Sequence, residues 1–209
     1  GLNTVSIVGQ KIIAEAGVRL PALAQKACQN GLSGLEEIAA IPGTIGGAVA
    51  INAGAYGSTI GQLVGKVEAL NPKGELIELD KNDLHFDYRQ SSLAKQKLTV
   101  LEVELQLYLD DPVLIQQRME RYLHQRTLKQ PLNLPNAGSV FKNPKGVAAG
   151  YLIEKAGTKG LRKGGAQVSD KHANFIVNVE NATAQDILDL IACVKGMVYQ
   201  TFNVQLQTE

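Results

Sequence analysis

The chain has 209 residues, of which 44% are hydrophobic and 20% are charged, and its formal net charge is +1. This composition is typical of a globular protein of one or two domains, and the near-neutral charge excludes a general attraction to nucleic acid or to anionic membranes. No apolar run is long enough to span a bilayer and the N-terminus has no signal-peptide pattern, so we expect no membrane insertion.

The N-terminal segment predicts two strands followed by two helices. Residues 1–9 and 11–15 read as strands, and because strands need partners, we expect part of a sheet to lie upstream. Pro21 suits the first turn of a helix that ends at Asn30-Gly31. The run Ser33-Gly-Leu-Glu36 has the spacing of a capping box and predicts a second, short helix.

The middle of the chain predicts a hairpin, a long strand and a helix. Residues 66–70 and 75–79 flank Asn71-Pro-Lys-Gly74, whose residue types favour a tight turn. Apolar residues alternate with polar ones through 99–109, which predicts an amphipathic strand. Asp111-Pro112 then begins a helix that continues to about Leu128.

The C-terminal segment predicts a linker and then a mixture of helices and strands. Residues 129–135 hold two prolines and no periodicity, so we expect a linker there. Residues 152–156 read as a helical turn, 174–179 as a buried strand, and 204–206 as the beginning of a last strand. Thr183 is expected to cap a final helix. The apolar face of that helix consists of Ile187, Leu190, Ile191, Val194, Val198 and Phe202.

These elements predict an α+β protein with a boundary after the 99–109 strand, which gives domains over 1–110 and 111–209. Cys28 and Cys193 lie far apart within helix-like patterns. Two reduced, buried thiols in a cytoplasmic protein explain this spacing better than a disulfide or a metal site, so no metal is expected.

Five glycines stand in the nearly uncharged run from Ile41 to Gly57. Glycine allows a positive φ and a close approach of backbone to another group, so such a run can surround a phosphate or a flat ring. A glycine-rich turn packed under a helix of small residues would look the same.

Two further segments carry polar side chains suited to a binding site. Tyr88-Arg89 offers a phenol and a fixed cation to an anionic group, although most surface arginines are only solvated. Ser139 lies among small residues, with Lys142 and Asn143 close by in sequence. No histidine stands in a nucleophile motif, so Ser139 is expected to donate a proton or orient a substrate rather than attack a carbonyl. A turn or cap serine is the alternative.

A basic, glycine-rich stretch lies between residues 149 and 174. Clustered cations beside flexible backbone would suit a diphosphate, whereas the simpler interpretation is a solvated basic loop. Its cations are Lys155, Lys159, Arg162, Lys163 and Lys171.

Taken in order, these segments resemble the UDP-N-acetylenolpyruvoylglucosamine reductase family, also called UDP-N-acetylmuramate dehydrogenase, in its shorter second subtype. The similarity spans nearly the whole chain. The matching runs are Gly31–Glu36, Ile41–Gly47, Asn52–Gly57, Tyr88–Ser91, Asn136–Pro144 and Ala149–Glu154.

The resemblance implies the C-terminal part of a PCMH-type FAD-binding domain, followed by an α+β substrate-binding domain. It implies that NADPH reduces bound FAD, which passes hydride to C3 of UDP-GlcNAc-enolpyruvate while a proton goes to C2, in peptidoglycan synthesis. We expect a monomer in the bacterial cytoplasm, with no nucleic-acid partner.

The resemblance also assigns roles to residues. Ser139 matches the proton donor to C2, Arg89 the cation that stabilises the enolate-like intermediate, and Glu209 an acidic partner. The predicted substrate contacts are Tyr88, Lys142, Asn143 and Gln167. The predicted cofactor contacts are Ile41, Pro42, Gly43, Thr44, Gly46, Gly47, Asn52, Gly54, Ala55, Tyr56 and Gly57.

The family's upstream loop that surrounds the FAD pyrophosphate is absent here, so we expect a fragment that alone binds FAD weakly or not at all and has little reductase activity. Two other functions stay open at this point. One is a non-catalytic nucleotide-sugar-binding module without a complete flavin site. The other is a different FAD oxidoreductase with the same flavin domain, although the runs Asn136–Pro144 and Ala149–Glu154 favour the reductase family.

Overall fold

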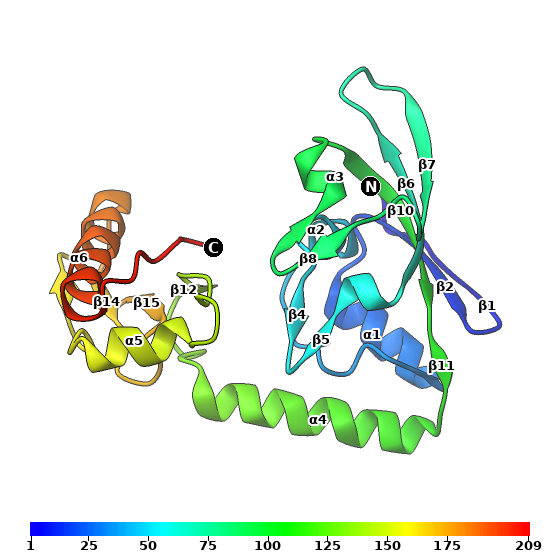
Figure 1. Ribbon diagram of the computed structural model, residues 1–209. Coiled ribbons are helices and arrows are strands. Elements are labelled where there is room, and N and C mark those ends of the chain that lie inside the picture. Colours follow the sequence, from blue (N-terminus) through cyan, green and yellow to red (C-terminus); the bar gives the residue numbers. More distant parts are fainter. The chain divides into compact units, whose positions relative to one another are not determined.

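The computed structural model describes residues 1–209 and divides into two units, Gly1–His124 and Gln125–Glu209 (Figure 1). Each unit has its own cluster of buried hydrophobic residues. The division falls within helix α4, Pro112–Lys129, whereas the predicted boundary at 110/111 lies at the beginning of that helix. The predicted domain boundary stays a prediction.

Unit 1 is built on a five-stranded antiparallel sheet in the order β1-β2-β10-β6-β7. The strands are β1 Val5–Val8, β2 Lys11–Glu15, β10 Thr99–Gln106, β6 Val64–Leu70 and β7 Leu76–Asp80. The 11–15 strand and the hairpin around Asn71–Gly74 are therefore confirmed, while the first strand begins later than predicted. The sheet provides the flat support on which the rest of the unit packs.

The predicted strand over 99–109 is wrong at its C-terminal end. Strand β10 ends at Gln106, and β11, Tyr108–Leu109, pairs instead with β3, Leu32–Ser33. The alternation predicted one buried face, yet Leu107 is buried and Leu109 is exposed. The chain leaves the sheet here to reach α4, so the apolar pattern outlasts the strand.

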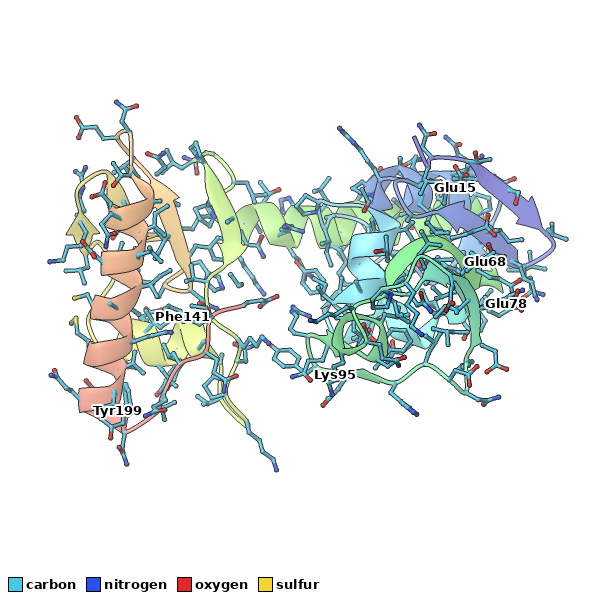
Figure 2. All side chains as sticks on the ribbon, turned by 90° about the horizontal axis from the view of Figure 1, so that it is seen from above. Glu15, Glu68, Glu78, Lys95, Phe141 and Tyr199 are labelled. Atoms are coloured by element: carbon cyan, nitrogen blue, oxygen red, sulfur yellow. The ribbon has the colours of Figure 1, made fainter.

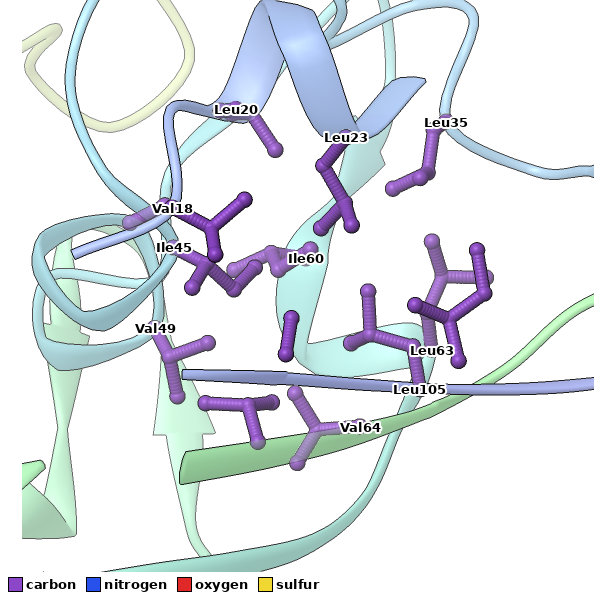
Figure 3. Packing of buried hydrophobic residues seen from close by; sticks show 14 of the residues in the cluster. Val18, Leu20, Leu23, Leu35, Ile45, Val49, Ile60, Leu63, Val64 and Leu105 are labelled. Atoms are coloured by element: carbon purple, nitrogen blue, oxygen red, sulfur yellow. The ribbon is translucent and has the colours of Figure 1, made fainter. Parts of the chain in front are cut away.

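Helices α1, Leu20–Gln29, and α2, Ile45–Ala50, cover one face of this sheet (Figure 1). Pro21 lies in the first turn of α1, as predicted. Side chains from both helices meet Ile60, Val64 and Leu105 in a continuous core (Figure 3). Burial of this apolar face provides the main stabilisation of unit 1.

The predicted helix after Ser33 is wrong, because residues 36–40 form turns. In a capping box the serine hydroxyl accepts a hydrogen bond from a backbone N–H. Here the Ser33 hydroxyl donates to Glu36 Oε1 at 2.8 Å, and the Gly34 N–H donates to Glu36 Oε2 at 2.6 Å. Arg118, from α4, also binds Glu36, so a long-range contact replaces the local cap.

Short elements complete unit 1 around the glycine run. Strands β4, Gly54–Ala55, and β5, Ser58–Thr59, pair with each other and lead into the 3₁₀ helix Ile60–Gln62. Strands β8, Phe86–Asp87, and β9, Gln90–Ser91, form a second small hairpin that precedes α3, Ser92–Lys95.

Unit 2 packs two helices against a four-stranded sheet in the order β12-β15-β14-β13. The strands are β12 Asn136–Ser139, β15 Phe175–Asn178, β14 Ala166–Val168 and β13 Arg162–Lys163, and the helices are α5 Ala149–Lys155 and α6 Ala184–Phe202. The linker, the 174–179 strand and the final helix are confirmed. Thr183 and Asp186 cap α6 reciprocally, with the Asp186 N–H donating to Thr183 Oγ1 at 3.1 Å.

The ends of the predicted C-terminal elements differ from the structure. Helix α5 begins at Ala149, earlier than predicted, and no strand forms over 204–206. On α6, Ile187 is exposed and Phe202 half-buried, while Leu190, Val194 and Val198 are buried.

The cysteines are both free thiols, but only Cys28 is buried and Cys193 is half-buried. Burial raises the pKa of the Cys28 thiol. No helix has the length and apolar character needed to cross a membrane. No group of three or more His, Cys, Asp or Glu side chains is placed to hold a metal ion.

Candidate functional site

The glycine run begins with a sharp entry into α2, and its glycines have two different roles. Thr44 is the N-cap of α2, and its Oγ1 accepts from the Gly47 N–H at 3.4 Å. The Gly46 N–H donates to the Ala16 carbonyl at 3.0 Å, and a Cβ on Gly46 would stand 2.7 Å from Ala16 Cβ. Gly46 therefore lets α2 pack directly on the chain beside β2.

Three other glycines of the run face open space. A Cβ added at Gly43 or Gly57 would meet nothing within 4 Å, and both residues have a positive φ, +133° and +92°. A Cβ on Gly47 would meet only Thr44 Oγ1, at 3.6 Å. These positions give bare backbone that a ligand can approach. The run therefore fits both interpretations: Gly46 serves close packing of a helix, whereas Gly43, Gly47 and Gly57 leave space for a ligand.

Burial divides the remaining predicted cofactor contacts in the same way. Pro42 and Tyr56 are exposed, Ile41, Thr44, Gly54 and Ala55 are half-buried, and Asn52 is buried. Asn52 Nδ2 donates to the Asp87 carbonyl at 2.9 Å, and its Oδ1 accepts from the Gly61 N–H at 3.0 Å. Asn52 thus joins the run to the β8–β9 hairpin and to the 3₁₀ helix.

The β8–β9 hairpin presents Arg89 at the end of the glycine run. Arg89 has a φ of +54°, and its Nη2 donates to the Gly54 carbonyl at 3.1 Å. Its guanidinium carbon lies 5.2 Å from the centroid of the exposed Tyr88 ring. Ser91, two residues further along the hairpin, donates its hydroxyl to the Ala50 carbonyl. Together with the hydrogen bond from Asn52 to the Asp87 carbonyl, the bonds of Arg89 and Ser91 fasten this hairpin to the glycine run. The hairpin therefore brings Arg89 and the predicted cofactor contacts together within unit 1.

In unit 2 the C-terminal segment returns to lie beside the segment that carries Ser139 (Figure 1). Phe141 forms an antiparallel bridge with Thr208. The Lys142 N–H donates to the Gln207 carbonyl and the Glu209 N–H donates to the Val140 carbonyl, both at 2.9 Å. Ser139 and Glu209 line the same pocket of about 380 Å³. The fold thereby unites two of the three predicted catalytic residues.

Buried Asn174 holds the segment after Ser139 in place. Its Oδ1 accepts from the Phe141 N–H at 3.0 Å, and its Nδ2 donates to the Phe141 carbonyl at 2.8 Å. Asn143 has a similar local duty, because its Oδ1 accepts from the Ala149 N–H at the beginning of α5, at 2.9 Å. Both amides make the path of the Ser139 segment well defined.

Ser139 also lines a second pocket, of about 390 Å³, whose other residues were mostly not predicted from the sequence. Tyr151, Glu154 and His172 contribute side chains, and Asn143 lies at its wall. Burial lowers the pKa of His172, and its Nδ1 accepts from the Asn174 N–H at 3.2 Å. A neutral imidazole is therefore favoured at neutral pH. In the sequence, only the position of His172 in a basic run indicated that it could lie at a site.

The remaining predicted substrate contacts are dispersed in unit 2. Gln167 lines a third pocket, of about 550 Å³, where its Nε2 donates to Asp170 Oδ2 at 3.0 Å. Lys142 is half-buried and lines none of these three pockets. The structure therefore brings Asn143, but not Lys142 or Gln167, into a pocket that Ser139 lines.

Much of the predicted cationic cluster is used in local contacts. Lys159 pairs with Glu154 at 3.0 Å and Arg162 with Glu180 at 3.4 Å. Lys155 lies over the Tyr151 ring, 5.8 Å from its centroid. Lys171 donates to the Thr127 carbonyl at 2.7 Å and lines two of the pockets. Among these cations, Lys171 is the one that lines these pockets.

Family models match both ends of the chain. A model described as the FAD binding domain matches residues 1–80, and one described as the UDP-N-acetylenolpyruvoylglucosamine reductase C-terminal domain matches residues 130–209. The first match covers the glycine run and the second covers Ser139 and Glu209.

Whole-chain relatives agree with these matches. The UDP-N-acetylenolpyruvoylglucosamine reductase of Carboxydothermus hydrogenoformans is 46% identical over 209 residues, which is 100% of this chain and 69% of the relative. That of Alkaliphilus oremlandii is 48% identical over 207 residues, which is 99% of this chain and 68% of the relative.

A solved structure has the same fold. The crystal structure of UDP-N-acetylenolpyruvylglucosamine reductase from Thermus caldophilus superimposes with a TM-score of 0.84 at 38% sequence identity. The superposition covers 94% of this chain and 71% of that one. The glycine run, the Ser139 segment and this agreement in sequence and fold place the chain in the UDP-N-acetylenolpyruvoylglucosamine reductase family.

Proposed function

We propose that Arg89, Ser139 and Glu209 carry the chemistry of the family's reaction in this chain. That reaction is the FAD-dependent, NADPH-driven reduction of UDP-GlcNAc-enolpyruvate to UDP-N-acetylmuramate in peptidoglycan synthesis. The observation that carries the proposal is the return of the C-terminal segment to Val140, because it puts Glu209 in one pocket with Ser139. Ser139 and Glu209 are far apart in sequence, so only the fold of the whole unit can bring them together.

FAD fits the glycine run on the evidence of its backbone. Gly43 and Gly57 have open space where a side chain would stand, and Pro42 and Tyr56 are exposed beside them. These four residues would contact the cofactor, while Gly46 and Asn52 hold the run in shape. When bound, FAD supplies the hydride that it has received from NADPH.

Arg89 supports the reaction as a fixed positive charge. A guanidinium is a cation whose planar fork suits a carboxylate. The hydrogen bond to the Gly54 carbonyl fixes its orientation before substrate arrives. Addition of hydride to C3 would increase negative charge toward the substrate carboxylate, and a preorganised cation there lowers the barrier.

Ser139 would deliver the proton to C2, and Glu209 would orient it. Ser139 is exposed on the wall of its pocket, so its hydroxyl can reach a ligand. A hydroxyl is a weak acid, so its neighbours must favour proton transfer, and the cation Lys142 is the candidate for this. Glu209 is the acidic group in the same pocket as Ser139. Substrate contacts are assigned to Tyr88, Lys142, Asn143 and Gln167.

We place the protein in the bacterial cytoplasm as a monomer, with its substrate and NADPH as partners. Two free thiols favour a reducing compartment. The location and the oligomeric state can be tested by fractionation of cells and by sedimentation of the purified protein.

The decisive experiment measures NADPH oxidation that depends on UDP-GlcNAc-enolpyruvate in the presence of FAD, in a polypeptide of the relatives' full length that carries this sequence. We expect Ser139→Ala to lower kcat by about 10²–10⁴, the usual contribution of a general acid, with little change in FAD binding. Ser6→Ala on exposed β1 is the matched control and should keep the wild-type rate. An unchanged rate in Ser139→Ala would remove Ser139 from the reaction. Binding of UDP-GlcNAc derivatives with no turnover in the wild type would favour the non-catalytic module instead.

A further inference from the structure

The end of the glycine run is held by a tyrosine of α4 that no sequence pattern singled out. We infer that Tyr122 is a positioning residue, which fixes Tyr56 and the loop Gly54–Gly57 in the conformation that contacts FAD. The inference rests on the proposed function in one respect, the contact of this loop with FAD. The fastening of the loop itself can be tested without any cofactor.

Tyr56 has an unusual backbone and two contacts with Tyr122. Its φ is +53°, in the left-handed region that non-glycine residues rarely adopt. The two tyrosine rings lie with their centroids 4.8 Å apart at an interplanar angle of 37°. The Tyr56 hydroxyl donates to the Tyr122 carbonyl at 3.3 Å. A left-handed tyrosine persists only when its surroundings hold it, and Tyr122 provides both contacts seen here.

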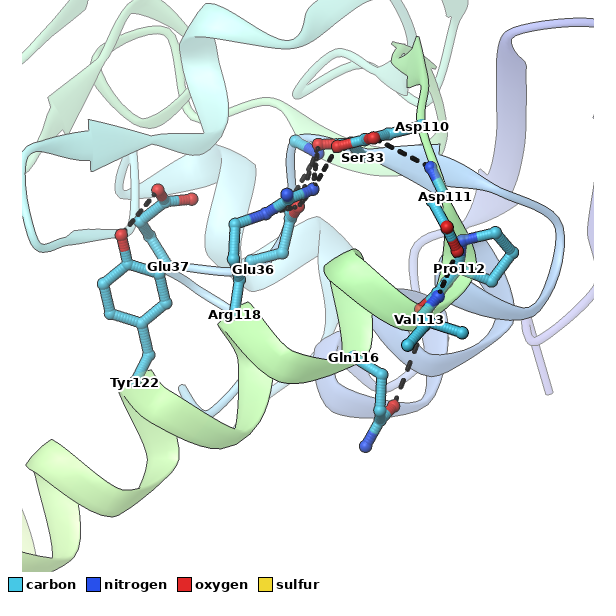
Figure 4. Close-up of polar contacts among 12 residues, drawn as sticks. Ser33, Glu36, Glu37, Asp110, Asp111, Pro112, Val113, Gln116, Arg118 and Tyr122 are labelled. Atoms are coloured by element: carbon cyan, nitrogen blue, oxygen red, sulfur yellow. Dashed lines mark hydrogen bonds and ion pairs between the residues drawn. The ribbon is translucent and has the colours of Figure 1, made fainter.

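Tyr122 is itself held by two contacts of its side chain. Its hydroxyl donates to Glu37 Oε1 at 3.0 Å, and the guanidinium of Arg121 lies 5.1 Å from its ring centroid. One turn earlier on α4, Arg118 binds Glu36 and Asp110 (Figure 4). This part of α4 is therefore immobilised on unit 1, and Tyr122 presents a fixed surface to the loop.

The loop Gly54–Gly57 connects Tyr122 both with a predicted FAD contact and with Arg89. Gly57, next to Tyr56, has open space where a cofactor can approach. Gly54, at the other end of the loop, accepts the hydrogen bond from Arg89. Release of Tyr56 would therefore loosen the predicted FAD contact and the anchor of the cation together. Removal of the Tyr122 ring should raise the KM for substrate as well as weaken FAD binding.

The test compares Tyr122→Leu, Tyr122→Phe and the control Tyr199→Leu. Tyr199 is an exposed tyrosine on α6, 48% accessible, in the other unit (Figure 2). Amide hydrogen exchange is measured first, without FAD, in the 209-residue chain. We expect Tyr122→Leu to accelerate exchange of the amides of residues 54–57 and to leave those of β10 unchanged. Tyr122→Phe keeps the ring and loses only the bond to Glu37, so its exchange should lie between that of the wild type and that of Tyr122→Leu. Tyr199→Leu should stay close to the wild type.

FAD affinity is measured next by flavin fluorescence, in a polypeptide of the relatives' full length that carries this sequence. Tyr122→Leu should raise the Kd for FAD by about tenfold, equivalent to the loss of one aromatic pair. Unchanged exchange at 54–57 in Tyr122→Leu would overturn the inference whatever the protein binds. Faster exchange with an unchanged Kd for FAD would overturn the positioning role. Absence of FAD binding in the wild type would contradict the proposed function and leave the exchange result to decide on Tyr122.

Discussion

Glu102 lies between two other glutamates on the face of the unit 1 sheet that is opposite the core. It pairs across strands with Glu15 on β2 and with Glu68 on β6, and Figure 2 shows Glu15 and Glu68 over this sheet. Partial burial raises the pKa of Glu102, and the charges of Glu68 and Glu15 raise it further. Its carboxylate is therefore less stable in the folded chain than in the unfolded one.

We expect Glu102→Gln to stabilise the protein at neutral pH. Because the folded-state pKa is raised, ionisation of Glu102 opposes folding as the pH rises through that pKa, and below its usual value the effect disappears. The free energy of unfolding should rise by roughly 0.2–1 kcal/mol at pH 7, as expected for relief of like charges, and converge with the wild type near pH 4. Urea unfolding at both pH values measures this. Glu104→Gln is the control and should lower the free energy of unfolding, because it removes the ion pair of Glu104 with Lys11 at 2.8 Å.

Asn174 is a buried side chain that holds the segment after Ser139 in unit 2. It makes two hydrogen bonds to the Phe141 backbone inside unit 2. Asn174→Ala leaves a buried N–H and a buried carbonyl without partners, and this should lower the free energy of unfolding by about 2–4 kcal/mol. Exposed Asn133→Ala should change it little. An equal, small effect of both changes would show that the Ser139 segment does not depend on this clamp.

At the scale of elements, α4 is fixed to unit 1 by an ionic cluster (Figure 4). Arg118 Nη2 lies 2.9 Å from Glu36 Oε1, and the Glu36 side chain is only 4% exposed. Burial alone would raise the pKa of Glu36, but hydrogen bonds from Gly34, Ser33 and Arg118 outweigh it and lower that pKa. The cluster therefore stabilises the fold at neutral pH and should lose its effect as the pH falls from the usual glutamate range through the lowered pKa.

Arg118→Met should be strongly destabilising, because it leaves the buried Glu36 carboxylate without its cation. We expect a loss of about 3 kcal/mol in the free energy of unfolding at pH 7. The double change Arg118→Met with Glu36→Gln should cost less than the sum of the single changes, because the two side chains interact. Unfolding in urea measures all three variants. Additive effects would mean that the two residues act independently.

Many of the helices and strands could be predicted from local sequence signals. The elements that were predicted wrongly have a common physical cause. The α6 cap, the turn at Asn71–Gly74 and the alternation in β10 depend on neighbours in sequence. By contrast, α2 contains two glycines and forms because Gly46 allows close packing on Ala16. The turn after Ser33 depends on Arg118, and the pairing of Glu209 with Val140 depends on the course of the whole unit. Long-range contacts of this kind leave no periodic pattern.

At the scale of the whole molecule, the chain has two separate hydrophobic clusters. Leu105 on β10 belongs to the first and Leu190 on α6 to the second, and both are 0% exposed. Each cluster draws its buried members from its own unit only. Because the buried side chains of each cluster pack within one unit, we expect each unit to have a cooperative transition of its own.

Calorimetry of the chain should therefore show two thermal transitions. Leu105→Ala and Leu190→Ala each remove buried methyl groups and should cost about 2–5 kcal/mol within their own unit. Each variant should lower the midpoint of one transition and leave the other in place, with Ser6→Ala as an exposed control. Hydrogen exchange then assigns each transition, because β10 amides should follow the first variant and α6 amides the second. A single transition that both variants lower equally would show that α4, which crosses the division between the units, couples them into one cooperative body.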